Sequence, residues 1–287
     1  MMTTDAKQRS ALNHRVTTPD HSSPLIAYCN HPAIRSIQRL RTREVREKTH
    51  LFYGEGLRFV YQAVQHRVPV ETLVICQPLL HHPPAQRLVR QLQHKGASIL
   101  EVTPQVMESL SLLQDSQGIG AVVHQQWEPL AEITPTNELC WLVLSQVRAP
   151  GNLGSMLRTS EAVGGAGIIL LGPETDPYDP ATVRATMGSL FAQRFVRTTV
   201  AEFARWKQRH HCQLIGTSPT ASTDYRSLVY RPPTLLLMGE ERQGLTPELQ
   251  SLCDDMACIP MVGTSDSLNV SVAAGVMLYE LFNQRPG

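Results

Sequence analysis

The sequence predicts an α/β protein of two domains, the second of which is built on a parallel sheet. Its 287 residues exceed one average domain and fall short of three. In the second half, short apolar runs alternate with helical patterns, which is typical of parallel strands joined by right-handed crossovers. A polar, proline-containing stretch at residues 125–137 has the composition of a linker and separates the two halves.

The overall composition is that of a folded protein. Hydrophobic residues make up 42% of the chain and charged residues 18%. The apolar runs are too short to cross a bilayer, and the polar N-terminal stretch lacks the apolar core of a secretory signal, so we expect a cytoplasmic protein without a membrane partner. The six cysteines are scattered without the spacing of metal ligands, and we therefore expect no metal site.

The first half divides into a tail and a small α/β domain. Residues 1–30 are polar and lack an apolar period, so we expect a mobile tail. Residues 31–124 form the smaller domain. Its expected helices lie at 34–48, 57–66 and 84–95, and its expected strands at 51–53, 72–76, 99–102 and 121–124.

The second domain, residues 138–287, opens with an apolar run suited to a strand that is buried on both faces. The expected strands lie at residues 142–144, 168–171, 213–215, 234–238 and 257–259. Ligands of open α/β sheets bind at the carboxyl ends of the strands, so the segments that follow these runs are the candidates for a functional site.

Three such segments carry Gly, Asn and charged residues. The first, residues 148–159, passes from a loop into a helix. If that helix begins near Leu153, Asn152 is its N-cap and Arg158 lies about a turn and a half further on. A helix cap followed by a surface arginine explains the same residues.

The second segment, residues 238–245, places Glu240, Glu241 and an arginine between glycines at the end of an apolar run. Glycine there permits close approach of the backbone to a ligand, although a plain strand-to-helix turn also fits. The third, residues 259–274, is a polar loop leading into a small-residue helix, which Ser267 or Asn269 could cap.

Taken together, the stretches GNLGSMLRTSEA, GEERQGL and IPMVGTSDSLNVSVAA resemble, in order and spacing, the three motifs of the SpoU (TrmH-type) branch of the SPOUT RNA methyltransferases. The resemblance runs from about Leu142 to Leu281 and includes residues 179–189. The first domain is similar, more loosely, to a ribosomal-protein-like substrate-binding domain at residues 52–56 and 117–119.

The resemblance implies a parallel sheet with a deep trefoil knot, a homodimer and S-adenosyl-L-methionine as the methyl donor. The positions that match the donor-binding residues of the family are Gly239, Ile259 and Leu268, with Thr217 and Met261 as neighbours. Apolar side chains that hold an adenine while backbone groups read its edge are ordinary pocket chemistry.

The resemblance also assigns roles in methyl transfer to a ribose 2′-hydroxyl. The residue matching Arg158 contacts the RNA phosphate and helps to activate the hydroxyl. Residues matching Asn152, Glu241, Ser267 and Asn269 shape the catalytic site. Because a guanidinium stays protonated in proteins, we interpret Arg158 as an electrostatic stabiliser of the developing alkoxide rather than as a free base.

The basic side chains of the first domain are the candidates for RNA binding. Residues 1–130 hold 14 Lys and Arg against 10 Asp and Glu, whereas residues 131–287 hold 12 against 15. The densest basic stretch contains Arg35, Arg39, Arg41, Arg43, Arg46 and Lys48, which we expect to contact phosphates. A solvated helix face with internal ion pairs is the alternative.

These features predict an RNA 2′-O-ribose methyltransferase, with ribosomal RNA favoured as the substrate. Transfer RNA is the alternative within the class, and methylation that confers antibiotic resistance is a narrower variant. A non-catalytic RNA-binding or ribosome-assembly factor is the alternative from another class. A nucleotide-dependent oxidoreductase is disfavoured because no phosphate-binding glycine loop follows the first strand of the second domain.

Overall fold

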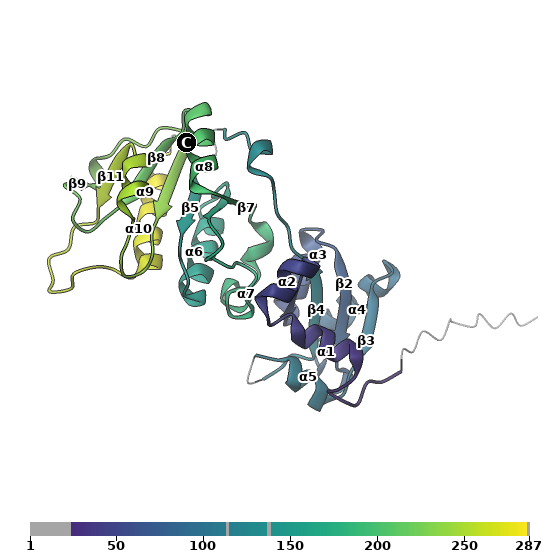
Figure 1. Cartoon of the computed structure of the whole chain (residues 1–287). Helices are drawn as coiled ribbons and strands as arrows, with labels where there is room; N and C mark the ends of the chain where they lie inside the picture. The colour runs from purple at the N-terminus through teal and green to yellow at the C-terminus, as the bar shows by residue number, and fades with distance from the viewer. Residues whose placement is uncertain (1–23, 113–114, 137–138, 286–287) are drawn as a thin grey trace, which may run out of the picture.

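The computed structural model describes residues 24–112, 115–136 and 139–285, whose helices and strands form two α/β units around two separate sheets (Figure 1). The expectation of two α/β domains is confirmed, since each sheet has its own helices. No helix within these ranges is both long enough and apolar enough to cross a membrane.

The N-terminal unit is a mixed sheet of four strands in the order β1-β4-β2-β3, in which β2 and β3 are parallel and β4 runs antiparallel to its neighbours. Helices α3 and α4 cover one face, and α1 and α5 cover the other. Its elements are α1 (Pro32–Arg39), α2 (Arg43–Thr49), β1 (Leu51–Glu55), α3 (Leu57–Gln65), β2 (Val70–Ile75), η1 (Gln77–Leu79), α4 (Pro83–His94), β3 (Ser98–Glu101), α5 (Pro104–Leu110) and β4 (Ile119–His124).

The expected tail ends before residue 30. Ile26 is buried, and its backbone bridges to Val102 at the end of β3. An apolar side chain that enters the core in this way offsets the entropy of ordering its neighbours. The remainder of the expected tail, residues 1–23, lies outside the described residues.

The expected helix at 34–48 is in fact two helices, because the chain turns at residues 40–42 between α1 and α2. The Arg46 guanidinium donates hydrogen bonds to the carbonyls of Leu40 and Arg41, each at 2.8 Å. These carbonyls lie just beyond the end of α1, where backbone acceptors lack helical partners. A side chain from the second helix therefore completes the C-terminus of the first.

The C-terminal unit is a seven-stranded parallel sheet in the order β7-β6-β5-β10-β8-β11-β9. Alternate strand residues face α6 and α10 on one side and α8 and α9 on the other. Its elements are β5 (Trp141–Ser145), α6 (Pro150–Ala162), β6 (Gly167–Leu171), α7 (Pro180–Thr186), η3 (Ser189–Ala192), β7 (Phe195–Thr198), α8 (Val200–Arg209), β8 (Gln213–Thr217), β9 (Thr223–Asp224), η4 (Tyr225–Ser227), β10 (Thr234–Met238), α9 (Pro247–Leu252), β11 (Asp255–Cys258) and α10 (Val270–Asn283).

The five expected strands of this sheet are confirmed as β5, β6, β8, β10 and β11. β7 and β9, which lie at the two edges of the sheet, are not among the predicted strands. β9 has two residues and β7 has four with a charged arginine among them, so neither presents an apolar run. The trefoil knot implied by the resemblance stays a prediction.

The stretch between the two units packs closely against the C-terminal one. It includes η2 (Leu130–Glu132), and Ile133 is fully buried and accepts a hydrogen bond from the Trp206 indole. Trp127 contacts Phe195 of β7 edge to face. The residues between the two units therefore have the composition of a linker, yet they pack in a fixed position against β7 and α8.

Candidate active site

The first motif forms the loop after β5 and the first turns of α6. This helix begins at Pro150, and its N-cap, Ala149, provides no side-chain hydrogen bond. The prediction that Asn152 is the N-cap is therefore wrong, because Asn152 lies inside the first turn. Proline is favoured at the first helical position, where its fixed φ suits the helix. The N–H of Ala149 is bonded instead by a side chain from the second motif.

That side chain is Glu241. Its Oε1 accepts hydrogen bonds from the Ala149 N–H at 2.9 Å and from the Asn152 amide at 3.4 Å. Burial raises the pKa of Glu241, but the hydrogen bonds from Ala149, Asn152 and nearby backbone groups outweigh burial and lower it on balance. A carboxylate at a helix N-terminus also interacts favourably with the helix dipole. Glu241 is thus an ionised, hydrogen-bonded group and a poor general base.

Gly239 precedes a tight turn that carries the second motif. Glu240 and Gly244 exchange two backbone hydrogen bonds, of 3.1 and 3.0 Å, which fold the turn back over Gly239. A Cβ at Gly239 would lie 2.3 Å from the backbone of Gly244. The turn itself therefore requires this glycine, a reason different from the close approach of a ligand inferred from the sequence.

The third motif joins the other two through Asn269. This residue is the N-cap of α10, since its Oδ1 accepts hydrogen bonds from the N–H groups of Ser271 and Val272. Its Nδ2 donates to Asn152 Oδ1 at 2.9 Å. A continuous chain of hydrogen bonds thus runs from Asn269 through Asn152 to Glu241. Three segments far apart in the sequence meet at this chain, and the first two of them follow the carboxyl ends of β5 and β10.

A cavity of about 360 Å³ opens next to this junction. All five residues that the sequence analysis assigned to the methyl donor line it, and so do Glu241 and Ser267. The donor-binding candidates are Thr217, Gly239, Ile259, Met261 and Leu268. The volume lies within the usual range for sites of small molecules and cofactors.

The walls of the cavity have the composition that an adenosyl group and an amino-acid tail require. Met238, Leu245 and Ile259 supply apolar surface, and Thr217 and Ser218 supply hydroxyls. Between residues 259 and 268, no backbone N–H or C=O bonds to another described residue. Those donors and acceptors are available to a ligand, which fits S-adenosyl-L-methionine held largely by backbone groups.

The remaining predicted catalytic residues lie at the edge of this arrangement. Asn152 and Asn269 do not line the cavity itself and instead connect its Glu241 to α6 and α10. Arg158 is exposed on α6, outside the cavity, and forms no hydrogen bond or ion pair with another described residue. Its charge is therefore directed at solvent.

The predicted RNA-binding stretch separates into exposed and occupied side chains. Arg35, Arg39, Arg41 and Lys48 are exposed. Arg46 has a side-chain exposure of 2% and pairs with Asp176 at 2.5 Å. The prediction that Arg46 contacts phosphate is therefore wrong for this structure, because its charge is already neutralised between the two units. Arg43 is also engaged, through an ion pair with Glu47 at 2.8 Å.

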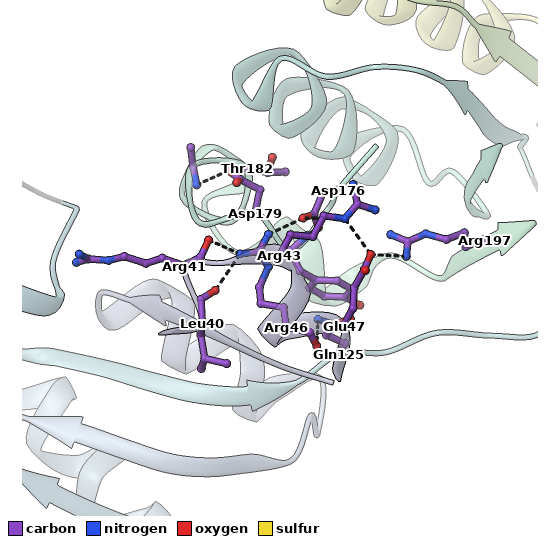
Figure 2. A network of polar contacts seen from close by, with 12 residues as sticks. Leu40, Arg41, Arg43, Arg46, Glu47, Gln125, Asp176, Asp179, Thr182 and Arg197 are labelled. Atoms are coloured by element: carbon purple, nitrogen blue, oxygen red, sulfur yellow. Dashed lines mark hydrogen bonds and ion pairs between the residues drawn. The ribbon is translucent and has the colours of Figure 1, made fainter. Parts of the chain in front are cut away.

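Figure 2 shows that these pairs form one network between the units. Asp176, in the loop before α7, forms an ion pair with Arg46 and lies 4.0 Å from Arg43. Arg197 of β7 pairs with Glu47 at 3.3 Å. We call this set of five residues the interdomain clasp. Asp176 and Arg197 come from segments that carry no motif and lie 130 to 150 residues from their partners on α2, so sequence patterns could not identify them.

Family models match most of the chain in two parts. Residues 140–279 match the SpoU rRNA methylase family, and residues 31–121 match a substrate-binding domain described as MRM3-like. A 23S rRNA (uridine(2479)-2′-O)-methyltransferase from Streptomyces viridochromogenes is 31% identical over 86% of this chain and 87% of its own length.

Solved structures of similar sequence have the same fold along nearly their whole length. An AdoMet-bound rRNA methyltransferase from Sinorhizobium meliloti is 34% identical, with a TM-score of 0.85 over 92% of this chain and 99% of its own. The SpoU methyltransferase AviRb from Streptomyces viridochromogenes, in complex with AdoMet, is 30% identical, with a TM-score of 0.81 over 88% of this chain and 97% of its own. These similarities, together with the convergence of the three motifs, show that the chain belongs to the SpoU rRNA methylase family.

Proposed function

We propose that this protein transfers the methyl group of S-adenosyl-L-methionine to a ribose 2′-hydroxyl of ribosomal RNA. The observation that carries the proposal is the hydrogen-bonded junction of Asn269, Asn152 and Glu241. It lies beside a cavity whose apolar side chains and hydroxyls suit the cofactor. Relatives named as 23S rRNA 2′-O-methyltransferases, and similar structures solved with AdoMet, support it.

The cofactor, when bound, supplies a methyl group activated by its sulfonium. The residues of the cavity bind and orient it: Ile259, Met261 and Leu268 contribute apolar surface, Thr217 contributes a hydroxyl, and the turn after Gly239 forms one wall. Fixing the reacting groups in line contributes several kcal/mol to catalysis, on the order of the 7–11 kcal/mol available from well-oriented reactants.

Glu241 acts by positioning rather than by taking a proton. Its lowered pKa and its hydrogen bonds to Ala149 and Asn152 keep it ionised and fixed. Asn152 is held from the other side by Asn269, so its amide is oriented at the entrance to α6. Ser267 lines the cavity and is free to meet the substrate or the donor.

Arg158 stabilises the charge that develops on the attacking oxygen and contacts the adjacent phosphate. The cavity that we propose for the methyl donor is called the donor cavity. The Arg158 guanidinium is exposed and lies outside this cavity, which supports a contact of Arg158 with RNA rather than with the cofactor. The exposed side chains of Arg35, Arg39, Arg41 and Lys48 bind phosphates further from the site.

The protein works as a homodimer. Val272, Tyr279 and Phe282 form an apolar stripe on the exposed face of α10, because they are spaced by seven and three residues. Leu268, which borders the donor cavity, is also exposed. A second copy covering this surface explains its apolar character. Sedimentation of the wild type and of Phe282→Glu tests this: the wild type should be dimeric and the variant monomeric, whereas a monomeric wild type contradicts it.

Ribosomal RNA is the favoured substrate because two relatives that each align with 86% of this chain are named 23S rRNA 2′-O-methyltransferases. Transfer RNA remains the alternative substrate. Since these relatives are bacterial proteins that act on ribosomal RNA, we place the reaction in the cytoplasm.

The direct test is incubation of the protein with methyl-labelled S-adenosylmethionine and total RNA, followed by nuclease digestion and mass spectrometry. The proposal predicts label on the ribose of one nucleotide of ribosomal RNA. Label on a base contradicts ribose chemistry, and label in transfer RNA selects the alternative substrate. A folded protein that binds the donor and labels no RNA identifies a non-catalytic binding factor.

A further inference from the structure

A second cavity, of about 270 Å³, lies between the two units at the free edge of β1. Its apolar lining comes from both units: Ile37, Leu40 and Phe59 on one side, and Val183 of α7 with Met187, the C-cap of that helix, on the other. Its volume is slightly below that of sites for drug-sized ligands, which suits one planar ring system.

Tyr53 and Glu55 of β1 line this cavity, and each carries one buried oxygen without a hydrogen-bond partner among the described residues. Glu55 Oε1 accepts a hydrogen bond from the Leu112 N–H at 2.6 Å, but its Oε2 is buried without a hydrogen-bond partner among the described residues. The Tyr53 hydroxyl is buried in the same way. Residues two apart on a strand lie on the same face, so the two groups are neighbours.

Such groups are rare in folded proteins because each costs about 1–3 kcal/mol when it is left unpaired. Burial raises the pKa of Tyr53, and the nearby Glu55 charge raises it further, so the hydroxyl is a donor at neutral pH. The side chains in the wall of the cavity thus include one buried donor without an acceptor and one buried acceptor without a donor. The edge of a nucleobase offers the complementary pair.

Three exposed arginines are among the residues that line the cavity: Arg41, Arg58 and Arg184. Arg58 is exposed and bonds to no other described residue through its side chain. Arg41 extends away from the interdomain clasp in Figure 2, and each of Arg41 and Arg184 spends one N–H on a backbone carbonyl, of Ser109 and Leu112. Since a guanidinium has five N–H donors, both retain donors for phosphate oxygens.

We propose that this cavity binds one unstacked nucleobase of the RNA substrate, with Tyr53 and Glu55 reading its edge and the three arginines holding the flanking phosphates. The inference rests on the proposed function, since it supplies a second anchor for the same RNA. α7 connects the two sites, because its Ala185 packs on Gly154 of α6 so closely that a Cβ at Gly154 would lie 2.4 Å away. A base held against α7 is therefore in a fixed relation to the methyl-transfer site.

The test uses the full-length protein saturated with S-adenosylhomocysteine, which keeps nucleotides out of the donor cavity. NMR titration measures the binding of AMP, GMP, CMP and UMP in turn. The wild type should bind at least one of them with a preference among bases, and Glu55→Gln and Tyr53→Phe should each weaken that binding about tenfold, the loss expected for a buried, charge-assisted hydrogen bond. Glu71→Gln, an exposed acid of the same unit, is the matched control and should bind as the wild type does.

Methylation kinetics distinguish this inference from the proposed function. In Glu55→Gln the KM for ribosomal RNA should rise about tenfold, while kcat and the affinity for S-adenosylmethionine stay unchanged. Unchanged nucleotide binding and unchanged KM in both variants overturn the nucleobase site and leave the methyltransferase proposal intact. A wild type that binds a nucleotide through Glu55 but methylates no RNA leaves the nucleobase site standing and overturns the methyltransferase proposal. Because Tyr53→Phe removes one oxygen and keeps the ring, it tests the site even if Glu55→Gln fails to fold.

Discussion

Arg158 and Glu241 carry opposite charges close to the same helix, and their surroundings assign them different work. The carboxylate of Glu241 is fixed by Ala149 and Asn152, whereas the guanidinium of Arg158 is exposed on α6. A fixed, ionised acid organises the protein around it. An exposed guanidinium can bind a ligand from solvent, and in the proposed reaction that ligand is RNA.

Arg158→Ala should therefore lower kcat for RNA methylation by about 100-fold or more, the loss typical of a removed electrostatic stabiliser. Because Arg158 lies outside the donor cavity, the affinity for S-adenosylmethionine, measured by calorimetry, should change less than twofold. Arg209→Ala, an exposed arginine of α8, is the control and should behave as the wild type. Loss of donor binding in Arg158→Ala would show that the residue has been misplaced.

Glu241→Ala should destabilise the protein by about 1–2 kcal/mol, since it removes the acceptor for the N-terminus of α6. The pKa of Glu241 is lower in the folded protein, so its stabilising contribution is complete above the unfolded value, near 4.5, and is lost as pH falls through the folded value. Urea unfolding at pH 7 and at pH 3 checks this. The difference from the wild type should shrink at pH 3, and an equal difference at both pH values would contradict it.

At the level of helices and loops, Asn269 has two separable functions. Its Oδ1 caps α10, and its Nδ2 bonds to Asn152 of α6. Asn269→Asp keeps the acceptor and loses the donor, whereas Asn269→Ala loses both. We expect the alanine variant to lose about 1 kcal/mol of unfolding free energy and the aspartate variant to lose little.

Both variants should be impaired in methyl transfer, because neither holds the Asn152 amide. Thermal melts and kcat for RNA methylation, measured side by side, separate capping from positioning. Full activity in Asn269→Asp would remove the Asn269–Asn152 bond from the account.

Helix α1 offers a comparable test of RNA binding. Arg35 and Arg39 are exposed and four residues apart, so they lie on one face of the helix. The double variant Arg35→Glu/Arg39→Glu should weaken binding to ribosomal RNA and reduce the slope of log affinity against log salt by about 0.7 to 0.9 for each phosphate that the protein no longer neutralises. Arg205→Glu/Arg209→Glu has the same spacing on α8 and serves as the control. Equal salt slopes in both doubles would place the RNA-binding surface elsewhere.

Across the whole molecule, the interdomain clasp fixes how the substrate-binding unit sits on the methyltransferase unit. Arg46 is almost fully buried, so removing Asp176 leaves its charge unpaired. Asp176→Ala should destabilise the protein by about 3 kcal/mol, whereas Glu47→Ala, at a half-exposed pair, should cost less than about 1 kcal/mol. Denaturant unfolding of the two variants and of Arg46→Met checks the assignment. A cost for Asp176→Ala no larger than that for Glu47→Ala would contradict it.

The sequence predicts those parts of the fold and site that are written locally. Apolar runs located the five inner strands. Four of the five residues that we had assigned to the cofactor, Gly239, Ile259, Met261 and Leu268, lie in the second and third motifs and line the cavity beside them. The starts of helices were less predictable. Asn152 has the chemistry of an N-cap, but α6 begins at Pro150. The side chain at its N-terminus is that of Glu241, which accepts a hydrogen bond from Ala149, 92 positions away in the sequence.

What the sequence could not predict depends on partners distant along the chain. Arg46 is one of several similar arginines in a basic stretch, and its burial against Asp176 follows from the docking of two units. The same docking creates the cavity beside β1, which belongs to neither unit alone. Composition and periodicity predict helices, strands and the apolar face of each. They do not predict which of these faces pack against one another.

The central claim is that one cavity at the junction of three motifs holds the methyl donor, and a crystal structure with S-adenosylhomocysteine bound tests it most directly. We predict the ligand between the turn after Gly239 and the loop at residues 259–268, with Leu268 and Ile259 against its adenine and Glu241 still bonded to Ala149. A ligand bound elsewhere, with this cavity closed or vacant, would contradict the account.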